Sequence, residues 1–248
     1  MRKPLFLLVG LVVLAASLAA QQTPDTVSRV FYVTPKAGME LQFEKALKAH
    51  ADWHRQRKDT WRWDIRYTET GRRSGEYIAI TGGHQWKDFD NPAVPAKDDG
   101  EHFLNNVAQF VASSSSLFLV VRPDMSRSAP DAPLPPISVV TFFHLKYGQT
   151  AKFVDAIRKL KEAQDKTDAP IRAAWLQVVG AGRNATFVVS VPRENWAAFE
   201  MSGPSLRERV EKVHGRVAAD AIFQALEESV DYSEVKITQA RPDLSYVP

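Results

Sequence analysis

A five-residue segment occurs twice in this chain, and it constrains the fold more than any other feature of the sequence. The segments are Arg122-Pro123-Asp124-Met125-Ser126 and Arg241-Pro242-Asp243-Leu244-Ser245, each after a run of strand-forming residues. Upstream spacings also recur: Gly38-x4-Phe43-x2-Ala46 as Gly148-x4-Phe153-x2-Ala156, and Trp86-x2-Phe89 as Trp196-x2-Phe199. The upstream pairs lie 110 positions apart and the closing segments 119, so the second copy has nine extra residues. A repeat of roughly 100 residues exceeds a solenoid unit and predicts a duplicated domain.

Alternation and helical spacing predict the same order of elements in each copy. In the first copy, strands are predicted at 30–33, 61–68, 76–81 and 117–121, helices at 39–54 and 103–111, and a loop at 90–100. In the second copy, strands are predicted at 139–143, 174–179, 186–191 and 235–237, and helices at 153–160 and 206–221. We expect the nine extra residues to lengthen the last helix.

The resulting βαββαβ order implies a four-stranded antiparallel sheet with both helices on one face. The other face would expose apolar surface, so the two copies should pair through it. The predicted organisation is a signal peptide in residues 1–20, a first repeat in 24–126, a Pro/Ala-rich linker in 127–136 and a second repeat in 137–248. Each residue from Gly38 to Phe89 should lie in the same element of its copy as the residue 110 positions later does in the second copy.

The element order, Gly-x4-Phe at the start of the first helix and Trp-x2-Phe after the third strand resemble the dimeric α/β-barrel superfamily. Its members include antibiotic-biosynthesis-monooxygenase-like, EthD-like and NIPSNAP-like domains. The resemblance covers both copies and implies an α+β protein, in which two tandem ferredoxin-like βαββαβ repeats pack sheet to sheet as a single-chain dimeric α/β barrel. These motifs are structural, so they indicate a fold and not an activity.

The first twenty residues indicate export. Arg2 and Lys3 precede an apolar run that ends in small residues, as in a secretory signal peptide, and the mature N-terminus is expected near Ala20 or Gln21. N-terminal sequencing of the exported protein would check this. The run is too short for a stable membrane anchor, and the absence of cysteine means that no disulfide supports the fold. Without residues 1–20 the chain has 30 basic and 29 acidic residues, which argues against a nucleic-acid partner. We therefore predict a periplasmic or secreted protein.

His50 and His54 lie four residues apart on the first predicted helix, so their side chains can converge on one metal ion or take part in a haem site. The alternative is a pair of half-buried histidines that helps to cover the sheet. This alternative is preferred because neither an HExxH pattern nor a cysteine accompanies the pair. The second copy has Leu160 and Gln164 at the matching positions.

Other candidate ligand-binding residues also fall in the first copy. His84 and Trp86 follow two glycines after a strand, where a ligand could approach the backbone, although His84 could equally be a turn residue. Arg62 and Arg66 flank Asp64 on one strand face and could bind an anion or form a solvated, salt-bridged row. We expect one pocket to bring His50, His54 and His84 together, with imidazoles less than ~12 Å apart if they share a metal or small ligand.

The sequence contains no GxSxG elbow, P-loop or dinucleotide fingerprint. The favoured hypothesis is an exported protein that binds a small molecule in a pocket of the first repeat. One alternative is a cofactor-independent monooxygenase or a haem-handling enzyme, of the kinds found in the superfamily. Another is a non-catalytic structural or oligomerising subunit. No specific motif supports haem, the superfamily's Asn/Trp/His haem site cannot be placed on this chain, and the sequence leaves open whether the protein is an enzyme or a homo-oligomer.

Overall fold

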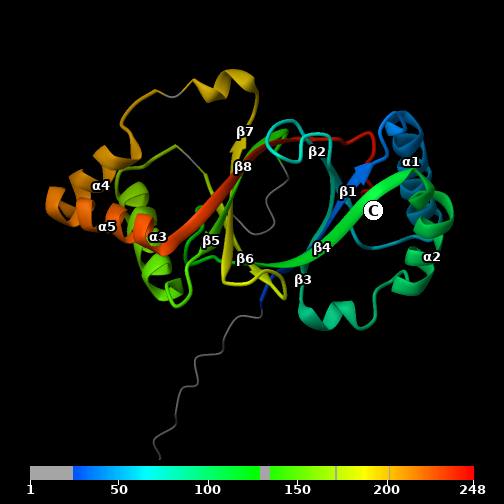
Figure 1. Ribbon diagram of the computed structural model, residues 1–248, viewed down its shortest axis with the longest axis horizontal. Helices are drawn as coiled ribbons and strands as arrows, with labels where there is room; N and C mark the ends of the chain where they lie inside the picture. Colours follow the sequence, from blue (N-terminus) through cyan, green and yellow to red (C-terminus); the bar gives the residue numbers. More distant parts are fainter. Residues whose placement is uncertain (1–24, 129–134, 171, 201) are drawn as a thin grey trace, which may run out of the picture.

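The computed structural model describes residues 25–128, 135–170, 172–200 and 202–248, and these form a mixed α+β fold (Figure 1). The described residues contain eight strands: β1 (Val27–Pro35), β2 (Asp64–Thr68), β3 (Tyr77–His84), β4 (Val111–Val121), β5 (Ile137–Leu145), β6 (Ala174–Val179), β7 (Thr186–Arg193) and β8 (Val230–Ala240). They also contain five helices: α1 (Glu40–Gln56), α2 (Ala96–Asn106), α3 (Thr150–Lys166), α4 (Leu206–His214) and α5 (Arg216–Ser229).

The eight strands form one closed antiparallel barrel in the order β1-β3-β2-β8-β5-β7-β6-β4. The first four strands are neighbours in the order β4-β1-β3-β2, and the last four follow the same order, β8-β5-β7-β6. The two sets join along their edges, where β2 pairs with β8 and β4 pairs with β6. Closure leaves no unpaired sheet edge, which removes a common route to aggregation.

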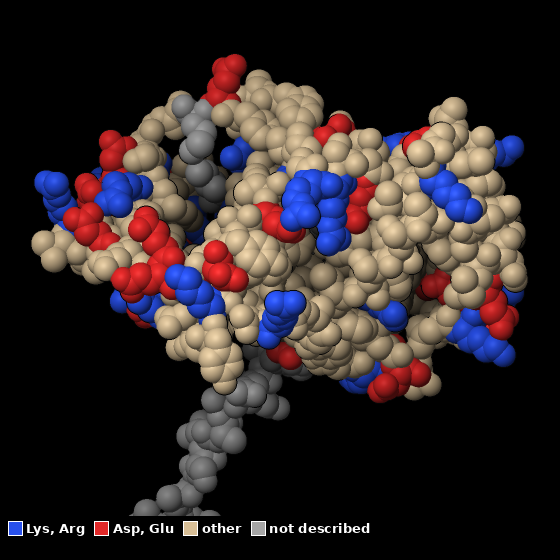
Figure 2. All heavy atoms as spheres, in the orientation of Figure 1, with Lys and Arg blue, Asp and Glu red and all other residues tan. Residues whose placement is uncertain are grey.

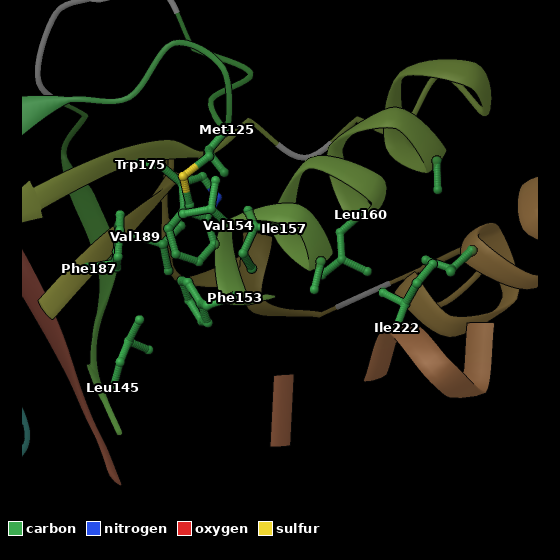
Figure 3. Packing of buried hydrophobic residues seen from close by; sticks show 14 of the residues in the cluster. Met125, Leu145, Phe153, Val154, Ile157, Leu160, Trp175, Phe187, Val189 and Ile222 are labelled. Carbon is green, nitrogen blue, oxygen red and sulfur yellow. The ribbon is translucent and has the colours of Figure 1, made fainter. Parts of the chain in front are cut away.

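Three apolar clusters fill the space around and inside the barrel. The helices lie on opposite sides of the strands, with α1 and α2 covering the first half and α3, α4 and α5 the second (Figure 1). The core between the second half and its helices centres on Phe153, Trp175 and Phe187 (Figure 3). A smaller core around Phe43 lies under α1. The third cluster lies between the inner faces of the two halves, with residues such as Tyr32 and Val188. The two sheets therefore share an interior core as well as two edge pairings.

Positions that recur in the sequence occupy matching places in the two halves. Gly38 and Gly148 precede α1 and α3, and both have φ of 77°, which favours glycine. Phe43 and Phe153 are fully buried residues of these helices, at 1% and 0% exposed. Trp86 and Trp196 each begin a short 3-10 turn after the third strand of their half. The expectation that residues 110 apart lie in the same elements is met at these pairs.

Several predicted boundaries differ from the structure. The first predicted loop, 90–100, is wrong at its end, because α2 begins at Ala96. The segment with the nine extra residues forms two helices, α4 and α5, because Gly215 breaks the helix with a φ of 80°. β2 begins at Asp64, so Trp61 and Trp63 precede the strand. β4 and β8 are also longer than predicted, since each extends toward the preceding helix where polar residues hid the strand pattern.

Each copy of the recurring Arg-Pro-Asp-x-Ser segment makes a hydrogen bond to the opposite half of the barrel. Ser126, after β4, accepts a hydrogen bond from the backbone N–H of Trp175 at 2.8 Å and donates one to the Arg122 carbonyl at 2.8 Å. Ser245, after β8, accepts one from the N–H of Ile65 at 2.9 Å and donates to the Arg241 carbonyl at 2.8 Å. Each segment therefore satisfies a backbone group on the opposite half.

The acidic residue of each segment binds its own arginine. Asp124 accepts two hydrogen bonds from Arg122, at 3.0 and 2.9 Å. Asp243 accepts the two equivalent bonds from Arg241, at 3.0 and 2.8 Å. Hydrogen bonds from Arg122, opposed by partial burial, hold the pKa of Asp124 at about 2. Arg241 also binds Glu44 on α1, which ties the C-terminal segment to the first helix.

Replacing either serine by alanine is expected to lower the free energy of unfolding by about 1–3 kcal/mol, because it leaves a buried backbone N–H without an acceptor. The measurement is urea unfolding of Ser126→Ala and Ser245→Ala, with exposed Ser202→Ala as the control. A loss no larger than that of Ser202→Ala would show that the segments do not fasten the halves.

The surface and the chain ends bear on the predicted partners. On the face drawn in Figure 2, basic and acidic side chains are interspersed, without an extended region of one sign. No helix among the described residues is long and apolar enough to cross a membrane. The predicted signal peptide, and residues 129–134 of the predicted linker, lie outside the described residues.

Candidate metal centre

Helix α1 carries His50 and His54 toward the protein interior. Its buried residues are Phe43, Leu47, His50, Ala51 and His54, which follow helical spacing along one face. The two histidines thus continue the stripe that packs on the sheet, and they are 9% and 3% exposed. In the second half the matching Leu160 is part of the apolar core. The pair is therefore a polar feature of the first half in a place that packing alone would fill with apolar residues.

Helix α2 brings a carboxylate to this pair. Asp99 lies in the first turn of α2, where the helix dipole favours negative charge. Its Oδ1 atom is 3.1 Å from His50 Nε2 and 3.4 Å from His54 Nε2. The three side chains each offer one ligand atom, and these atoms all lie within 4.8 Å of one another. Two imidazoles and a carboxylate therefore converge on one point between α1 and α2.

The other nitrogen of each imidazole has its own partner. His54 Nδ1 is 2.8 Å from Asp59 Oδ2, and because a carboxylate accepts, that nitrogen carries the proton. His50 Nδ1 is 2.8 Å from His102 Nδ1, one donor facing one acceptor. Burial lowers the pKa of His102, with the nearby His50 and His54 adding to the effect, which suits His102 to the acceptor role. In the tautomer that metal-bound histidines adopt, with the proton on Nδ1, both Nε2 lone pairs would face the point where Asp99 lies.

The side chain of Asp99 is 28% exposed, but one of its two carboxylate oxygens is buried. Its Oδ1 is buried and has no hydrogen-bond partner of acceptable geometry, although both Nε2 atoms are near it. Burial would raise the pKa of Asp99, but His50 and His54 outweigh burial and hold it well below its ordinary value. Asp99 is therefore ionised, and its Oδ1 lies beside the Nε2 atoms of both imidazoles.

The chain after α1 is shaped to place Asp59. Lys58 has a φ of 53°, in the left-handed region, and the Asp59 N–H returns to the His54 carbonyl at 3.1 Å. The Asp59 carboxylate, in a residue 4% exposed, also accepts from the Trp61 N–H at 3.0 Å and from Trp63 Nε1 at 3.3 Å. Several donors thus fix Asp59, and Asp59 in turn fixes the tautomer and orientation of His54.

His84 lies in a different aromatic cluster. Its Nε2 is 2.6 Å from Thr81 Oγ1. The centre of its ring is 4.0 Å from that of Trp61 and 5.4 Å from that of Phe89. Burial lowers the pKa of His84, which favours the neutral imidazole. Trp86 is 40% exposed and also packs on Phe89. A single pocket shared by His84 with His50 and His54 stays a prediction.

Arg62 precedes β2 and Arg66 lies within it, and the two side chains have different surroundings. Arg62 is half exposed and pairs with Asp64 at 2.7 Å. Arg66 is 3% exposed, and its guanidinium donates to Thr238 and to the carbonyl of Pro135 at 2.8 Å, beside the linker. Arg66 therefore binds backbone and hydroxyl acceptors of the second half, and Arg62 is held by its own neighbour.

Sequence reasoning found the two histidines but missed Asp99, His102 and Asp59. The signal for the first two was present, because Asp99-x-x-His102 has the spacing of one helix face. It was hidden by the predicted loop, since Asp98 and Gly100 disfavour helix. Asp59 could not be placed from spacing, because its position depends on the reversal at Lys58.

Comparisons with known proteins show the fold. No protein-family model matches the chain, and no curated protein matches its sequence. Among solved structures, a candidate monooxygenase from Lactobacillus acidophilus NCFM superposes with a TM-score of 0.55 at 10% identity, covering 90% of this chain and 96% of the other. An anthrone oxidase-like protein gives 0.52 at 12% identity, with 92% and 98% covered. A mutant chlorite dismutase from Candidatus Nitrospira defluvii, in complex with cyanide, gives 0.52 at 9%, with 88% and 92% covered. These are dimeric α/β-barrel proteins, and this chain shares their fold.

Proposed function

We propose that this protein binds a divalent transition-metal ion through His50, His54 and Asp99, and that its small-molecule ligand binds at the open positions of that ion. The observation that carries the proposal is the convergence of both Nε2 atoms on the buried Oδ1 of Asp99, which has no hydrogen bond. In a tetrahedral site with bonds of 2.0–2.2 Å, ligand atoms lie about 3.3–3.6 Å apart. The separations of Asp99 Oδ1 from the two Nε2 atoms, 3.1 and 3.4 Å, are close to that range, and all three ligand atoms lie within 4.8 Å of one another.

The donor set favours a functional ion over a structural one. Structural zinc sites use four protein ligands, whereas three leave a position for water or substrate. Two histidines and one carboxylate suit Zn²⁺ and also non-haem Fe²⁺. Asp59 and His102 hold the outer nitrogens of the two imidazoles, as partners of metal-bound histidines do.

A titration with Zn²⁺ and Co²⁺ tests the proposal, using tag-free protein freed of metal with a chelator. We expect one ion per chain and, at 100 times the dissociation constant, about 2.7 kcal/mol of added stability, or roughly 5–11 °C in Tm. The double variant His50→Ala/His54→Ala should lose both the Co²⁺ spectrum and the Tm shift, while His84→Ala should keep them. Equal binding by the double variant, or none by the unaltered protein at millimolar metal, would show that these residues form an ion pair or a structural cluster.

A second candidate is an oxygen-activating enzyme that uses Fe²⁺. It is favoured by the donor set itself, which is that of many non-haem iron oxygenases. The monooxygenase and oxidase names of fold neighbours are compatible with it but show only a shared fold. It predicts that the Fe²⁺ form consumes O₂ in the presence of a reductant, and that the double variant does not.

Haem fits these histidines less well. An axial ligand must point a nitrogen into a space that accepts the macrocycle. His50 and His54 direct Nε2 at Asp99, and His84 directs Nε2 at Thr81 within 2.6 Å. A cavity of about 460 Å³ between the two halves of the barrel is lined by His144 and not by these three histidines. We therefore base no step on haem.

The wider sequence inferences are proposals of the same kind. Tandem duplication is supported by the recurring segments and by the matching strand order of the two halves. Export is supported by the composition of residues 1–20. A homo-oligomer, or a purely structural subunit, is the alternative that remains if metal binding fails.

A further inference from the structure

A second feature lies at the end of the barrel formed by the β2–β3 and β6–β7 turns. A cavity of about 460 Å³ opens there, between the two halves. Its wall includes Tyr32 of β1, Phe142 of β5 and Lys236 of β8, together with Arg73 of the β2–β3 turn. Pockets for small organic ligands have about this volume and are mostly apolar with a few polar groups. None of the metal-centre residues lines this cavity.

Lys236 is the unusual residue of this wall. It is 9% exposed, and its Nζ lies 4.5 Å from the Tyr32 ring centre and 5.4 Å from that of Phe142. The carboxylate beside it belongs to Glu76, whose Oε2 is 3.6 Å away, too far for a hydrogen bond. That oxygen is buried and also has no hydrogen-bond partner. The ammonium of this mostly buried side chain, in the wall of the cavity, therefore has room to donate hydrogen bonds to a bound molecule.

The charges of the wall favour an anion. Arg72, Arg73 and Lys236 line the cavity against one lining carboxylate, Glu234, which is 3.9 Å from Arg72. Glu76 lies next to Lys236 and is also 3.5 Å from Arg73. Three cations therefore meet two carboxylates, and one positive charge stays uncompensated at the cavity.

The two halves of the barrel have different residues at one matching position of the cavity wall. Tyr32 and Phe142 lie 110 positions apart, and Leu117 and Lys236 lie 119 apart, so each pair holds matching positions in the two halves. All four line the cavity. Leucine in one half shows that an apolar side chain fills this position, and lysine must overcome a desolvation cost there. The lysine therefore serves something other than packing.

We propose that this cavity binds a small monoanionic organic molecule with a carboxylate on a flat apolar body. The carboxylate accepts hydrogen bonds from Lys236, with Arg73 adding positive charge at the edge. The flat body lies among Tyr32, Phe142 and Leu117, and the aromatic rings contribute contact area and stacking. The site is separate from the metal centre in both residues and location.

Calorimetric titration with 2-naphthoate, in EDTA so that no metal can bind the carboxylate, tests this proposal. We expect one site per chain. Lys236→Leu, which installs the residue found at the matching position, should weaken binding at least tenfold. Lys236→Arg should bind within a fewfold of the unaltered protein, and Lys159→Leu on α3, whose lysine is about half exposed, should change nothing.

The uncharged analogue 2-naphthamide separates charge recognition from apolar binding. It should bind more weakly than naphthoate and equally to the unaltered protein and to Lys236→Leu. Equal affinity for the acid and the amide, unchanged naphthoate binding by a folded Lys236→Leu variant, or no binding at millimolar naphthoate would each overturn the proposal. The double variant His50→Ala/His54→Ala should bind naphthoate normally, so failure of the metal centre and failure of this cavity are distinguishable.

Discussion

Replacing Phe153 by alanine is expected to lower the free energy of unfolding by about 3–5 kcal/mol, the range for a fully buried aromatic side chain. Phe153 is 0% exposed and lies at the centre of the second-half core (Figure 3). Its ring centre is 5.6 Å from that of Phe143, 5.9 Å from Trp175 and 5.3 Å from Phe187. These neighbours come from three strands, so the site cannot collapse around the missing ring without moving the sheet.

The matched variant is Phe43→Ala, at the same position of the first half. Phe43 is 1% exposed, and its ring centre is 5.0 Å from that of Tyr77. Because two edge pairings and both serine contacts join the halves, we expect the barrel to unfold as one unit. Both variants should therefore lower a single transition, each by roughly 6–20 °C.

Thermal and urea unfolding, followed by near- and far-ultraviolet circular dichroism, measure both variants. Tyr147→Ala is the control, because Tyr147 is 91% exposed and should change stability by less than about 0.5 kcal/mol. Two separate transitions, with only the second-half signal lost in Phe153→Ala, would show that the halves unfold independently.

Local patterns in the sequence were sufficient for the helices that pack on the sheet. Phe43 and Phe153 could be placed because helical spacing and the recurring Gly-x4-Phe agree. Strand pairing between the halves was not accessible in the same way. β2 and β8 meet through Arg66, Thr68 and Thr238, polar residues whose burial depends on contacts about 170 positions away. The barrel-end cavity has the same origin, since its wall combines residues of both halves.

The candidate metal centre could be predicted only in part, for a related reason. His50 and His54 are neighbours on one helix, and their spacing alone suggests a shared ligand. The third donor comes from another helix whose composition hides it, and only folding shows that Asp99 faces the pair. The other candidates, His84, Arg62 and Arg66, make hydrogen bonds or ion pairs with groups other than Asp99. Residue type alone identified the candidates, and the contacts of each polar atom show which of them lie beside Asp99.

Asp59→Asn is expected to weaken metal binding about 10–100-fold, because an outer partner of a metal-bound histidine controls its tautomer and orientation. The carboxylate now accepts from His54 Nδ1, Trp63 Nε1 and the Trp61 N–H. An amide has one oxygen, so one edge must present N–H groups to a donor. If that edge faces His54, the imidazole proton moves to Nε2 and blocks the metal.

Competition with a chromophoric chelator measures the Zn²⁺ dissociation constant of Asp59→Asn, and unfolding in EDTA shows separately any loss of stability without metal. The matched control is Asp52→Asn, an exposed residue of α1 that pairs with Arg55, and its affinity should equal that of the unaltered protein. The two variants remove the same charge from the same neighbourhood, so a general electrostatic effect would weaken both. Only a direct effect on His54 predicts that Asp59→Asn alone loses affinity while still binding one ion per chain. Unchanged affinity in Asp59→Asn would show that the Asp59 carboxylate does not control how His54 binds the metal.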